Sequence, residues 1–574
     1  MRKSILVLPA LFLFFTAFCQ DPKIKWGDEF KLHRGSTDLS VIYSDNSGVY
    51  LQEDHLALKT YFVIGATTRS SATLVKLDKN LSEVYRNAFD KELKGKNFDQ
   101  FFIIRGRILI LANEYNKRER LLTLYAAEID KNTGDLKSDW RSLTDFQKDE
   151  KSDEIKYRVA LNDDSTKMVI VSSEEGRSKN TYKVQEFDNN FKPAKPVVIS
   201  NEFDPETFQL EDVLYSDHKV ITLVGRVYQY EPGKKKKSKF LDFENYNIRM
   251  YNAAGKQLAE INTDINGKWL TSTKLVQKKD NDLVLAAFYS NKKKGKTIDG
   301  MLIQRINPQT GQVISTNQKD INTSLLTTLS DQTTDDNDDE GETRAERKER
   351  ERLDQIKDDG QSFSRFMQFS DIYYTNDGGV VILAEKYHHY YTTTQSYSGG
   401  SNGAPGHWTT TTYSVYECGD LMMCKVDGDG NINWLQVLPK AQREIIMTGR
   451  NSYGLTTNNY FYPYNMPFYA GFGSMEKNNT LYIFFNDSPK NSGVMQPGQK
   501  VKTISRFGKS DCFVLSVDES TGRYKRNIFF SNNDVPTSMP RLGSVTGDQM
   551  YIVGKHDRLM MGKTKIAVAR IMVD

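Results

Sequence analysis

One short unit recurs along this chain, and it limits the folds that the chain can adopt. In the unit an apolar strand ends at Asp or Asn, a tight turn follows, and a second strand begins. The stretch Gly419–Trp434 shows it clearly, because apolar residues run up to Val426, Asp427 opens the turn and Gly430 closes it. Asp can accept hydrogen bonds from N–H groups of its own turn, and Gly readily takes positive φ. The turn residues of the seven copies are Asp78, Asp130, Asp188, Asn252, Asn307, Asp427 and Asp518.

The spacing of the copies predicts the architecture. The first five turn residues lie about 50 to 65 residues apart. Upstream of the turns, a short polar turn followed by a dense apolar strand recurs, as at 217–225, 280–288, 376–385 and 477–485. Each unit therefore holds about four short strands, and serial four-stranded repeats of this period are typical of a β-propeller. We expect an all-β fold with eight blades, with seven as the alternative.

The two ends of the chain predict how the ring closes. Segments 541–547, 549–555 and 564–573 supply three strands of a last blade, and then the sequence stops. Near the other end, segment 23–32 resembles an outer strand such as 431–438. We expect this N-terminal strand to complete the last blade, because closure removes the exposed edges of an open ring.

Three of the turns resemble those of a known propeller family. The motifs DKNTG at 130–134, NPQTG at 307–311 and ESTG at 519–522 are similar to the repeats of eight-bladed quinoprotein-like (PQQ-type) propellers, a resemblance that covers most of the chain. Those repeats place a tryptophan after the turn. Trp434 lies near that place and Trp140 is displaced from it. The sequence has no adjacent Cys-Cys pair and no calcium site of the quinone-dependent enzymes, so the resemblance implies a non-catalytic scaffold member without a cofactor.

The first residues have the pattern of a secretory signal. Arg2 and Lys3 precede an apolar run from Ile5 to Phe18 that is too short to span a bilayer. We expect cleavage after Cys19, which leaves 20–574 as a single propeller domain in the periplasm or at the outer surface of a bacterial envelope. A lipid anchor on Cys19 is the alternative, and Phe18 disfavours it. No later segment is apolar enough to be transmembrane.

Charge and cysteine content exclude some classes of protein. The net charge of +4 is too small to predict nucleic-acid binding. After signal cleavage three cysteines remain, Cys418, Cys424 and Cys512. Cys418 and Cys424 are too far apart to bridge along one extended strand, so we expect buried free thiols.

Loop lengths predict which face of the propeller is functional. The turns between first and second strands, and between third and fourth strands, are short throughout. On the other face the connections are long, and loops on a rigid scaffold commonly carry binding sites. The long segments are 228–244, 291–297, a charged insertion at about 322–366, 386–419, 441–468 and 486–510.

Two groups of residues on that face are candidate binding sites. Tyr and Trp offer rigid amphipathic contact area for a protein or a glycan, although the aromatic loop insertion at about 386–417 could also pack on itself or be disordered. Its candidates are Tyr387, His388, His389, Tyr390, Tyr391, Tyr397, His407 and Trp408. A metal bound by His388 or His389 with His407 matches no standard spacing, so we predict no metal. The second group is either an anion-binding patch or a set of solvated lysines, and it comprises Lys234, Lys235, Lys236, Lys237, Lys292, Lys293 and Lys294.

The charged insertion at 322–366 has two interpretations, a solvated disordered segment or a docking segment. The sequence contains no G-x-S-x-G, H-E-x-x-H, Walker or C-x-x-C motif. This favours a secreted non-enzymatic propeller that binds a protein or glycan partner. The alternative is a carbohydrate-active or other hydrolytic enzyme with its site in the central funnel, which would need two carboxylates, or a His and a carboxylate, to converge there.

Overall fold

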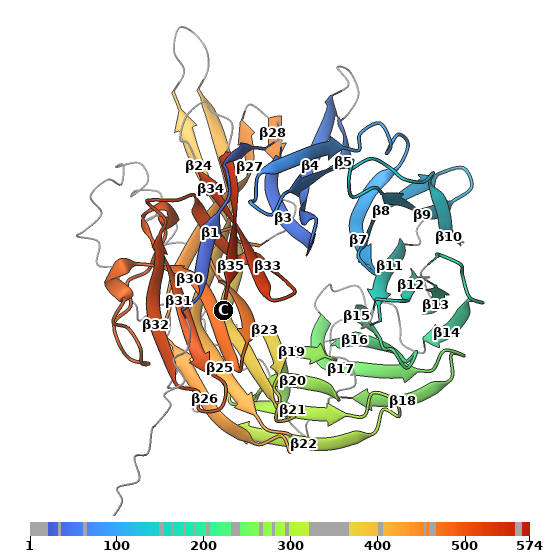
Figure 1. Cartoon of the computed structure of the whole chain (residues 1–574). Coiled ribbons are helices and arrows are strands. Elements are labelled where there is room, and N and C mark those ends of the chain that lie inside the picture. Colours follow the sequence, from blue (N-terminus) through green and yellow to red (C-terminus); the bar gives the residue numbers. More distant parts are fainter. Residues whose placement is uncertain are drawn as a thin grey trace, which may run out of the picture.

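The computed structural model describes residues 21–32, 36–60, 66–147, 154–162, 165–175, 180–188, 190–201, 207–230, 241–262, 268–277, 282–292, 298–320, 367–399, 406–452, 455–458, 466–556 and 565–573. The predicted signal (1–19) and the predicted charged insertion (322–366) lie outside these residues. The described part is built almost entirely of antiparallel strands. It forms eight sheets that follow one another around a ring, blades 1 to 8 (Figure 1).

In blades 1 to 5 and in blade 7 the strands pair in chain order, and in blades 1 to 5 the first strand lies nearest the centre of the ring. Blade 1 comprises β3 (Ser36–Asp45), β4 (Gly48–Thr60), β5 (Ala66–Leu77) and β6 (Glu83–Ala88). Blade 2 comprises β7 (Asn97–Ile104), β8 (Arg107–Asn116), β9 (Leu121–Ile129) and β10 (Arg141–Gln147). Blade 3 comprises β11 (Glu154–Leu161), β12 (Met168–Glu175), β13 (Asn180–Phe187) and β14 (Val197–Asn201). Blade 4 comprises β15 (Phe208–Tyr215), β16 (Ile221–Tyr230), β17 (Leu241–Tyr251) and β18 (Gln257–Asn262).

The second half of the ring follows the same plan, with one enlarged blade. Blade 5 comprises β19 (Trp269–Val276), β20 (Leu283–Ser290), β21 (Gly300–Ile306) and β22 (Val313–Asp320). Blade 6 comprises β23 (Met367–Tyr374), β24 (Val380–Ser398), β25 (His407–Val426), β26 (Ile432–Leu438), β27 (Gln442–Ser452) and β28 (Leu455–Asn458). Blade 7 comprises β29 (Phe472–Lys477), β30 (Thr480–Asp487), β31 (Asp511–Asp518) and β32 (Tyr524–Ser531), with two short 3-10 helices at Pro489–Asn491 and Phe507–Lys509.

Blade 8 is assembled from both ends of the chain. Its strands β33 (Thr537–Thr546), β34 (Gln549–His556) and β35 (Lys565–Met572) are followed in the sheet by β1 (Lys23–Trp26), and β2 (Phe30–Lys31) also pairs with β35. The antiparallel register runs from Lys23 opposite Met572 to Trp26 opposite Ala569. The predicted closure by the N-terminal strand is confirmed, and the ring has eight blades.

The apolar second strands of the blades are buried on both faces, which explains why their sequences are unbroken runs of apolar residues. On β20, Val284, Ala286 and Phe288 pack with blade 6. The alternating residues Leu283 and Leu285 pack with blade 4. This follows from the two-residue side-chain period of a strand between two neighbouring sheets. All eight junctions between neighbouring blades hold a cluster of buried apolar side chains of this kind.

The seven recurring turns share one hydrogen-bonding device. In each, a side-chain oxygen of the opening Asp or Asn accepts backbone N–H groups of the same turn. The three Thr-Gly turns are one residue longer than the other four: Gly522 N–H donates to Asp518, whereas in the shorter turn Gly430 N–H donates to Asp427. The sequence pattern thus encodes two turn lengths.

The Thr-Gly turn of blade 7 also joins that blade to blade 6. The indole N–H of Trp434 donates to the backbone carbonyl of Glu519 at 3.0 Å. The indole lies against Gly522, where a Cβ would lie 2.5 Å from a ring carbon, and the φ of Gly522 is 69°. Only glycine fits both the backbone conformation and the close approach. Trp434 of blade 6 therefore packs against the Thr-Gly turn of blade 7 and joins the two blades.

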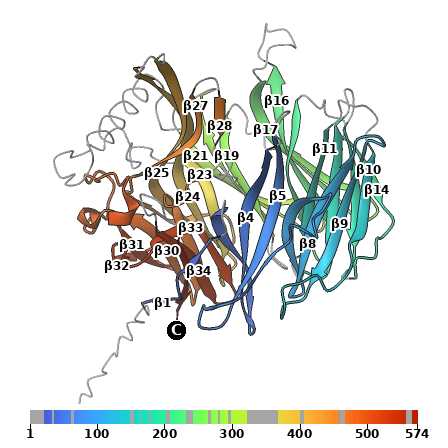
Figure 2. The ribbon, with the colours of Figure 1, turned by 90° about the horizontal axis from the view of Figure 1, so that it is seen from above.

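Blade 6 departs from the plan because its two central strands are extended. Strands β24 and β25 have 19 and 20 residues and pair from Val380–Val426 out to Ser398–His407. The two ends of β25 have different outer partners, β26 near the body of the ring and β27 further out. Figure 2 shows this hairpin, with β27 and β28, projecting from one side of the ring.

The segment 386–417, expected as a loop insertion, is therefore largely a β-hairpin, with residues 400–405 outside the described part. The reason is its composition. Thr, Tyr and Trp, which dominate it, favour strands when they can pair across a hairpin.

Candidate functional site: an aromatic face on blade 6

The two faces of the projecting hairpin differ in exposure. Thr392 and Thr394 on one face are buried. On the other face the side chains of Tyr391, Tyr397 and Trp408 are exposed to 61%, 58% and 62%. Thr393 and Gln395 are exposed between them. We call these five exposed residues the aromatic face.

The rings of this face are ordered by contacts with one another and with the base of the hairpin. Tyr397 and Trp408 are direct cross-strand partners, with ring centroids 5.2 Å apart. Nearer the body of the propeller, His389 stacks on Tyr416 with ring centroids 4.3 Å apart, and it contacts Tyr391 with ring centroids 4.9 Å apart. Cross-strand aromatic pairs of this kind stiffen a hairpin and hold the rings in place.

The hairpin is also free of charge. No Asp, Glu, Lys or Arg occurs between Lys386 and Glu417, although these four residue types make up 26% of the chain. The aromatic face therefore offers flat rings together with the neutral hydroxyl and amide groups of Thr393 and Gln395. Such a surface can stack on apolar faces and exchange neutral hydrogen bonds, but it cannot form ion pairs.

The remaining candidates of the hairpin lie nearer its base. His388 Nδ1 lies 3.7 Å from Glu417, and His389 Nε2 lies 3.3 Å from the hydroxyl of Ser414. Burial, helped by the neighbouring His388, holds the pKa of His389 below its usual value. Tyr390 donates to Glu417 at 3.4 Å. These side chains position the hairpin, whereas the three exposed rings are available for contact.

The structure separates the histidines that a metal site would need. His407 pairs with Ser398, about 30 Å along the strand from His389 at the usual rise per residue. Within the part of the chain that the structure describes, no group of three or more metal-ligating side chains comes together.

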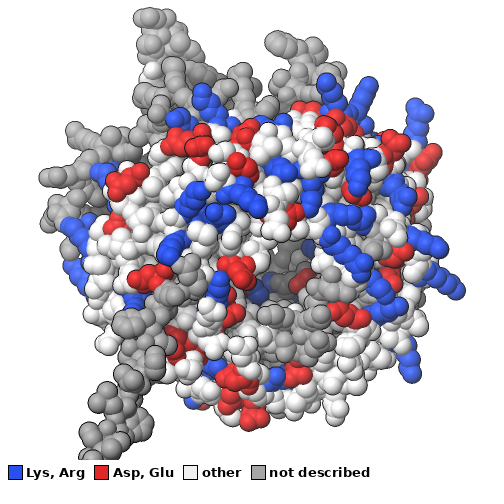
Figure 3. All heavy atoms as spheres, viewed as in Figure 1, with Lys and Arg blue, Asp and Glu red and all other residues white. Residues whose placement is uncertain are grey.

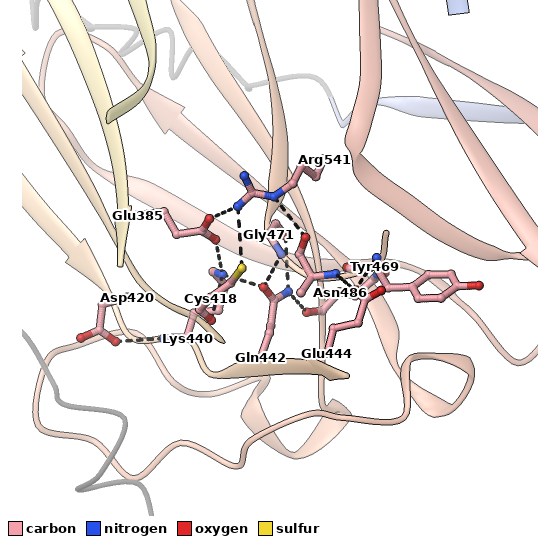
Figure 4. Close-up of polar contacts among 11 residues, drawn as sticks. Glu385, Cys418, Asp420, Lys440, Gln442, Glu444, Tyr469, Gly471, Asn486 and Arg541 are labelled. Atoms are coloured by element: carbon pink, nitrogen blue, oxygen red, sulfur yellow. Dashed lines mark hydrogen bonds and ion pairs between the residues drawn. The ribbon is translucent and has the colours of Figure 1, made fainter. Parts of the chain in front are cut away.

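A buried polar network fixes the hairpin to its neighbours (Figure 4). Lys440 Nζ, fully buried, donates to Glu385 at 2.6 Å and to Gln442 at 2.7 Å. The other carboxylate oxygen of Glu385 pairs with Arg541 from blade 8. Arg541 also lies over the ring of Tyr387, with its guanidinium 5.1 Å from the ring centroid. Tyr387 thus belongs to this structural network and not to the aromatic face.

The same network holds the connection from blade 6 to blade 7. The carboxylate of Glu444 accepts three successive backbone N–H groups, from Phe468, Tyr469 and Ala470. Burial raises the pKa of Glu444 to about 6, while these donors act in the opposite direction. A Cβ at Gly471, where φ is 96°, would lie 2.0 Å from Arg541. Sequence reasoning missed this network, because its members come from four separate segments that share no motif.

The predicted lysine patch falls almost wholly outside the described residues. Of its seven members only Lys292 is described, and it is exposed. Lys234 to Lys237, Lys293 and Lys294 lie outside. Figure 3 shows Lys and Arg intermingled with Asp and Glu on the face in view, so that face carries charges of both signs. In the described part, no helix has the length and apolar character needed to cross a membrane.

Carboxylates on two inner strands join neighbouring blades. Asp99 on β7 accepts a hydrogen bond from Tyr157 of blade 3 at 2.8 Å, and Asp371 on β23 accepts one from Ser474 of blade 7 at 2.8 Å. Both lie at irregularities in strand pairing. Burial raises the pKa of Asp99. These contacts favour a structural role for the two carboxylates over a catalytic one in the funnel.

The three cysteines are buried and free, as the sequence predicts. Burial raises the pKa of each thiol to about 12, which keeps Cys418, Cys424 and Cys512 protonated and unreactive near neutral pH.

Glu519 is a buried carboxyl group near other carboxylates. It is 4% exposed, and within the described residues its Oε1 has no hydrogen-bond partner. Burial, with Glu476, Asp377 and Asp518 nearby, raises its pKa from 4.5 to about 7, and Lys425 opposes this only partly. The folded protein therefore binds this proton more tightly than the unfolded chain does.

We expect Glu519 to make stability fall as pH rises from about 4.5 to 7, because the native state holds the extra proton over that range. Glu519→Gln should remove this dependence. The variant should be more stable than the wild type at pH 8, by on the order of 2–3 kcal/mol, and equal to it near pH 4. Urea unfolding at both pH values measures the effect. Asp429→Asn, which changes an exposed acid in the turn of blade 6, is the control, and parallel pH profiles for wild type and Glu519→Gln would contradict the expectation.

Comparison with known proteins gives little beyond the fold. No family model matches this sequence, and no curated protein sequence is similar to it. Among solved structures, the β-propeller domain of the Trilobed protease from Pyrococcus furiosus is 10% identical, with 85% of this chain and 98% of that chain covered and a TM-score of 0.32. The polysaccharide lyase Uly1 is 10% identical, with 96% and 100% covered and a TM-score of 0.33. The α-L-arabinofuranosidase Arb93A from Fusarium graminearum is 9% identical, with 52% and 98% covered and a TM-score of 0.29.

These similarities are too low to bear on function. The structure itself shows the strand order, the eight cores between blades and the closure of blade 8 by β1. The chain is an eight-bladed β-propeller whose sixth blade carries a projecting aromatic hairpin.

Proposed function

We propose that this protein is a non-enzymatic propeller that binds an extended, uncharged glycan through the aromatic face of blade 6. The observation that carries the proposal is the exposure of Tyr391, Tyr397 and Trp408 on one face of a hairpin that lacks charged residues. Large aromatic side chains cost free energy when they are exposed to water, so three on one face indicate a surface that is covered when the protein functions.

The spacing of the rings favours a long ligand. Tyr391 and Tyr397 are six residues apart on one strand, which corresponds to about 20 Å. A single sugar cannot reach both, whereas an extended oligosaccharide can. Binding at two linked points raises the affinity well above that of either point alone. We therefore expect affinity to increase steeply with glycan length.

The neutral character of the hairpin favours a glycan over a protein partner. Protein interfaces typically gain specificity from charged groups at their rims. Here the polar groups beside the rings are Thr393 and Gln395, whose hydroxyl and amide groups suit the hydroxyl groups of a neutral sugar.

The test compares the wild type with a Tyr391→Ser/Tyr397→Ser/Trp408→Ser variant. Calorimetric titration with neutral β-1,4- and α-1,4-linked glucans, from disaccharide to octasaccharide, gives the dissociation constants. We expect the triple variant to lose at least about thirtyfold in affinity for the best octasaccharide, which is about 2 kcal/mol over three rings. The wild type should not shorten the glycans on prolonged incubation.

The matched control removes three exposed apolar side chains elsewhere, with Val84→Ser, Val198→Ser and Ile314→Ser. It should bind as the wild type does. Failure of every glycan to bind, or equal binding by the wild type and the triple variant, would sink the proposal. If the wild type captures one envelope protein and the triple variant does not, the partner is a protein and not a glycan.

The proposal also places the protein outside the cytoplasm, in the periplasm or at the outer surface. Its support is the secretory pattern of residues 1–19. Fractionation of cells that express the full chain, with a signal-deleted form as control, tests this placement.

A further inference from the structure

A pocket of about 540 Å³ opens between blades 2 and 3, on the side of the ring that carries the recurring turns. Its lining includes Ala126 and Ala127 near the end of β9 and the aromatic residues Trp140 and Phe191. This volume lies in the range of small-molecule sites. The pocket is distinct from the aromatic face, which projects from the opposite ends of the strands.

The pocket exists because the chain makes a detour in blade 2. In blade 6 the turn closes at Gly430 and the outer strand begins at Ile432. In blade 2 the turn closes at Gly134, but β10 begins only at Arg141. Leu136 still bridges Ile129, and the N–H of Lys137 donates to the carbonyl of Glu128, so only residues 138–140 depart from the edge of β9. The indole N–H of Trp140 donates to the carbonyl of Glu92 at 3.1 Å, which fixes that ring on the side of blade 2 that faces blade 1.

Phe191 forms the other wall in a strained conformation. Its φ is 58°, in the left-handed region that bulky residues rarely adopt. In two of the equivalent turns this position is Gly255 or Gly430. In a third it is Leu81, which is 1% exposed and is held by the core between blades 8 and 1. Phe191 is only partly buried, packs against the core between blades 2 and 3, and lines the pocket.

Four charged residues line the pocket: the cations Arg107 and Arg141, the acid Glu128 and the exposed acid Asp139. Arg107 pairs with Glu128 at 3.3 Å and lies over the ring of Phe191, and Lys137 shares the same carboxylate at 2.9 Å. Glu128 is thus neutralised by two cations. Arg141 donates to the backbone carbonyl of Asn190 at 2.7 Å, which holds its guanidinium at the pocket without neutralising its charge.

We propose that this pocket binds a small molecule that places a carboxylate beside a flat, apolar face. The flat face packs against the ring of Phe191, and the carboxylate pairs with Arg141, which is held beside Asn190 and whose planar guanidinium suits such a partner. An aromatic acid and a sugar acid share this chemistry. The inference does not depend on the glycan proposed for blade 6.

The test uses calorimetric titration of the mature protein with benzoate and with glucuronate. The acid that binds more tightly shows whether the ligand is an aromatic acid or a sugar acid. Benzyl alcohol and glucose are the neutral counterparts. We expect saturable binding of one acid that Arg141→Gln and Phe191→Gly each weaken at least tenfold. Phe191→Gly should nevertheless keep the thermal midpoint within a few degrees of wild type, because glycine relieves the backbone strain.

Two controls make the result specific. Leu81→Gly changes the equivalent turn position but should lower the thermal midpoint by many degrees and leave acid binding intact, because it empties a core. Arg118→Gln removes an exposed guanidinium elsewhere and should change neither property. The proposal is overturned if neither acid binds at millimolar concentrations, if both pocket variants bind as wild type does, or if the neutral counterparts bind equally well.

Discussion

Removal of residues 20–31, so that the mature chain begins at Leu32, is expected to open the ring and to cost about 5 kcal/mol or more of stability. The deletion takes away β1 and β2, which together form the outer edge of blade 8. Ile24 and Trp26 of β1 pack against the core between blades 7 and 8, and the ring of Trp26 meets that of Phe530 edge-on at 5.7 Å. Burying each large apolar side chain contributes about 1.5–3 kcal/mol, and each ladder hydrogen bond contributes about 0.5–1.5 kcal/mol.

The deletion should also change how the protein associates. Strand β35 would become an exposed, largely apolar edge, and such edges pair with other chains. Urea unfolding and size-exclusion chromatography measure the two effects. A chain that begins at Asp21 is the control, and Trp26→Ala tests the largest single side chain of β1. An unchanged unfolding midpoint and a monomeric deletion variant would show that β1 does not close the ring in solution.

Replacement of Glu385 by Leu is expected to cost about 3–5 kcal/mol. The carboxylate is 2% exposed and neutralises two cations at once, Lys440 at 2.6 Å and Arg541. Without it both charges stay inside the protein, where desolvation is expensive and the remaining hydrogen bonds to neutral groups compensate only in part. Because the network lies under the hairpin, the aromatic face should also lose its fixed orientation.

A double variant separates the loss of the carboxylate from the presence of an unpaired cation. Adding Lys440→Met to Glu385→Leu should recover part of the lost stability, since one buried charge is removed with its partner. Lys137→Met breaks an ion pair whose lysine is 59% exposed, and it should cost less than about 1 kcal/mol. If Glu385→Leu costs no more than Lys137→Met, the buried network contributes nothing to stability.

The sequence alone determined the architecture, because the features that specify it are local. Asp427 and Gly430 define a turn within five residues, and a related turn that begins at Asp78 or Asp518 identifies another blade. Repetition then predicts the ring, since an isolated four-stranded sheet would leave both apolar faces exposed to water. The closing strand at 23–32 was also predictable, because it resembles the outer strands that it replaces.

The tertiary structure alone decided where the candidate sites lie. The sequence predicts a loop insertion at 386–417, whereas cross-strand pairing from Tyr387–Cys418 out to Ser398–His407 makes it a hairpin with an exposed ring face. Glu385, Lys440 and Arg541 share no sequence motif, and their charges meet only when blade 6 has folded and blade 8 lies against it. The pocket beside Phe191 likewise needs two neighbouring blades. Local spacing encodes strands and turns, whereas a site built across blades depends on contacts between residues far apart in the chain, which no local pattern records.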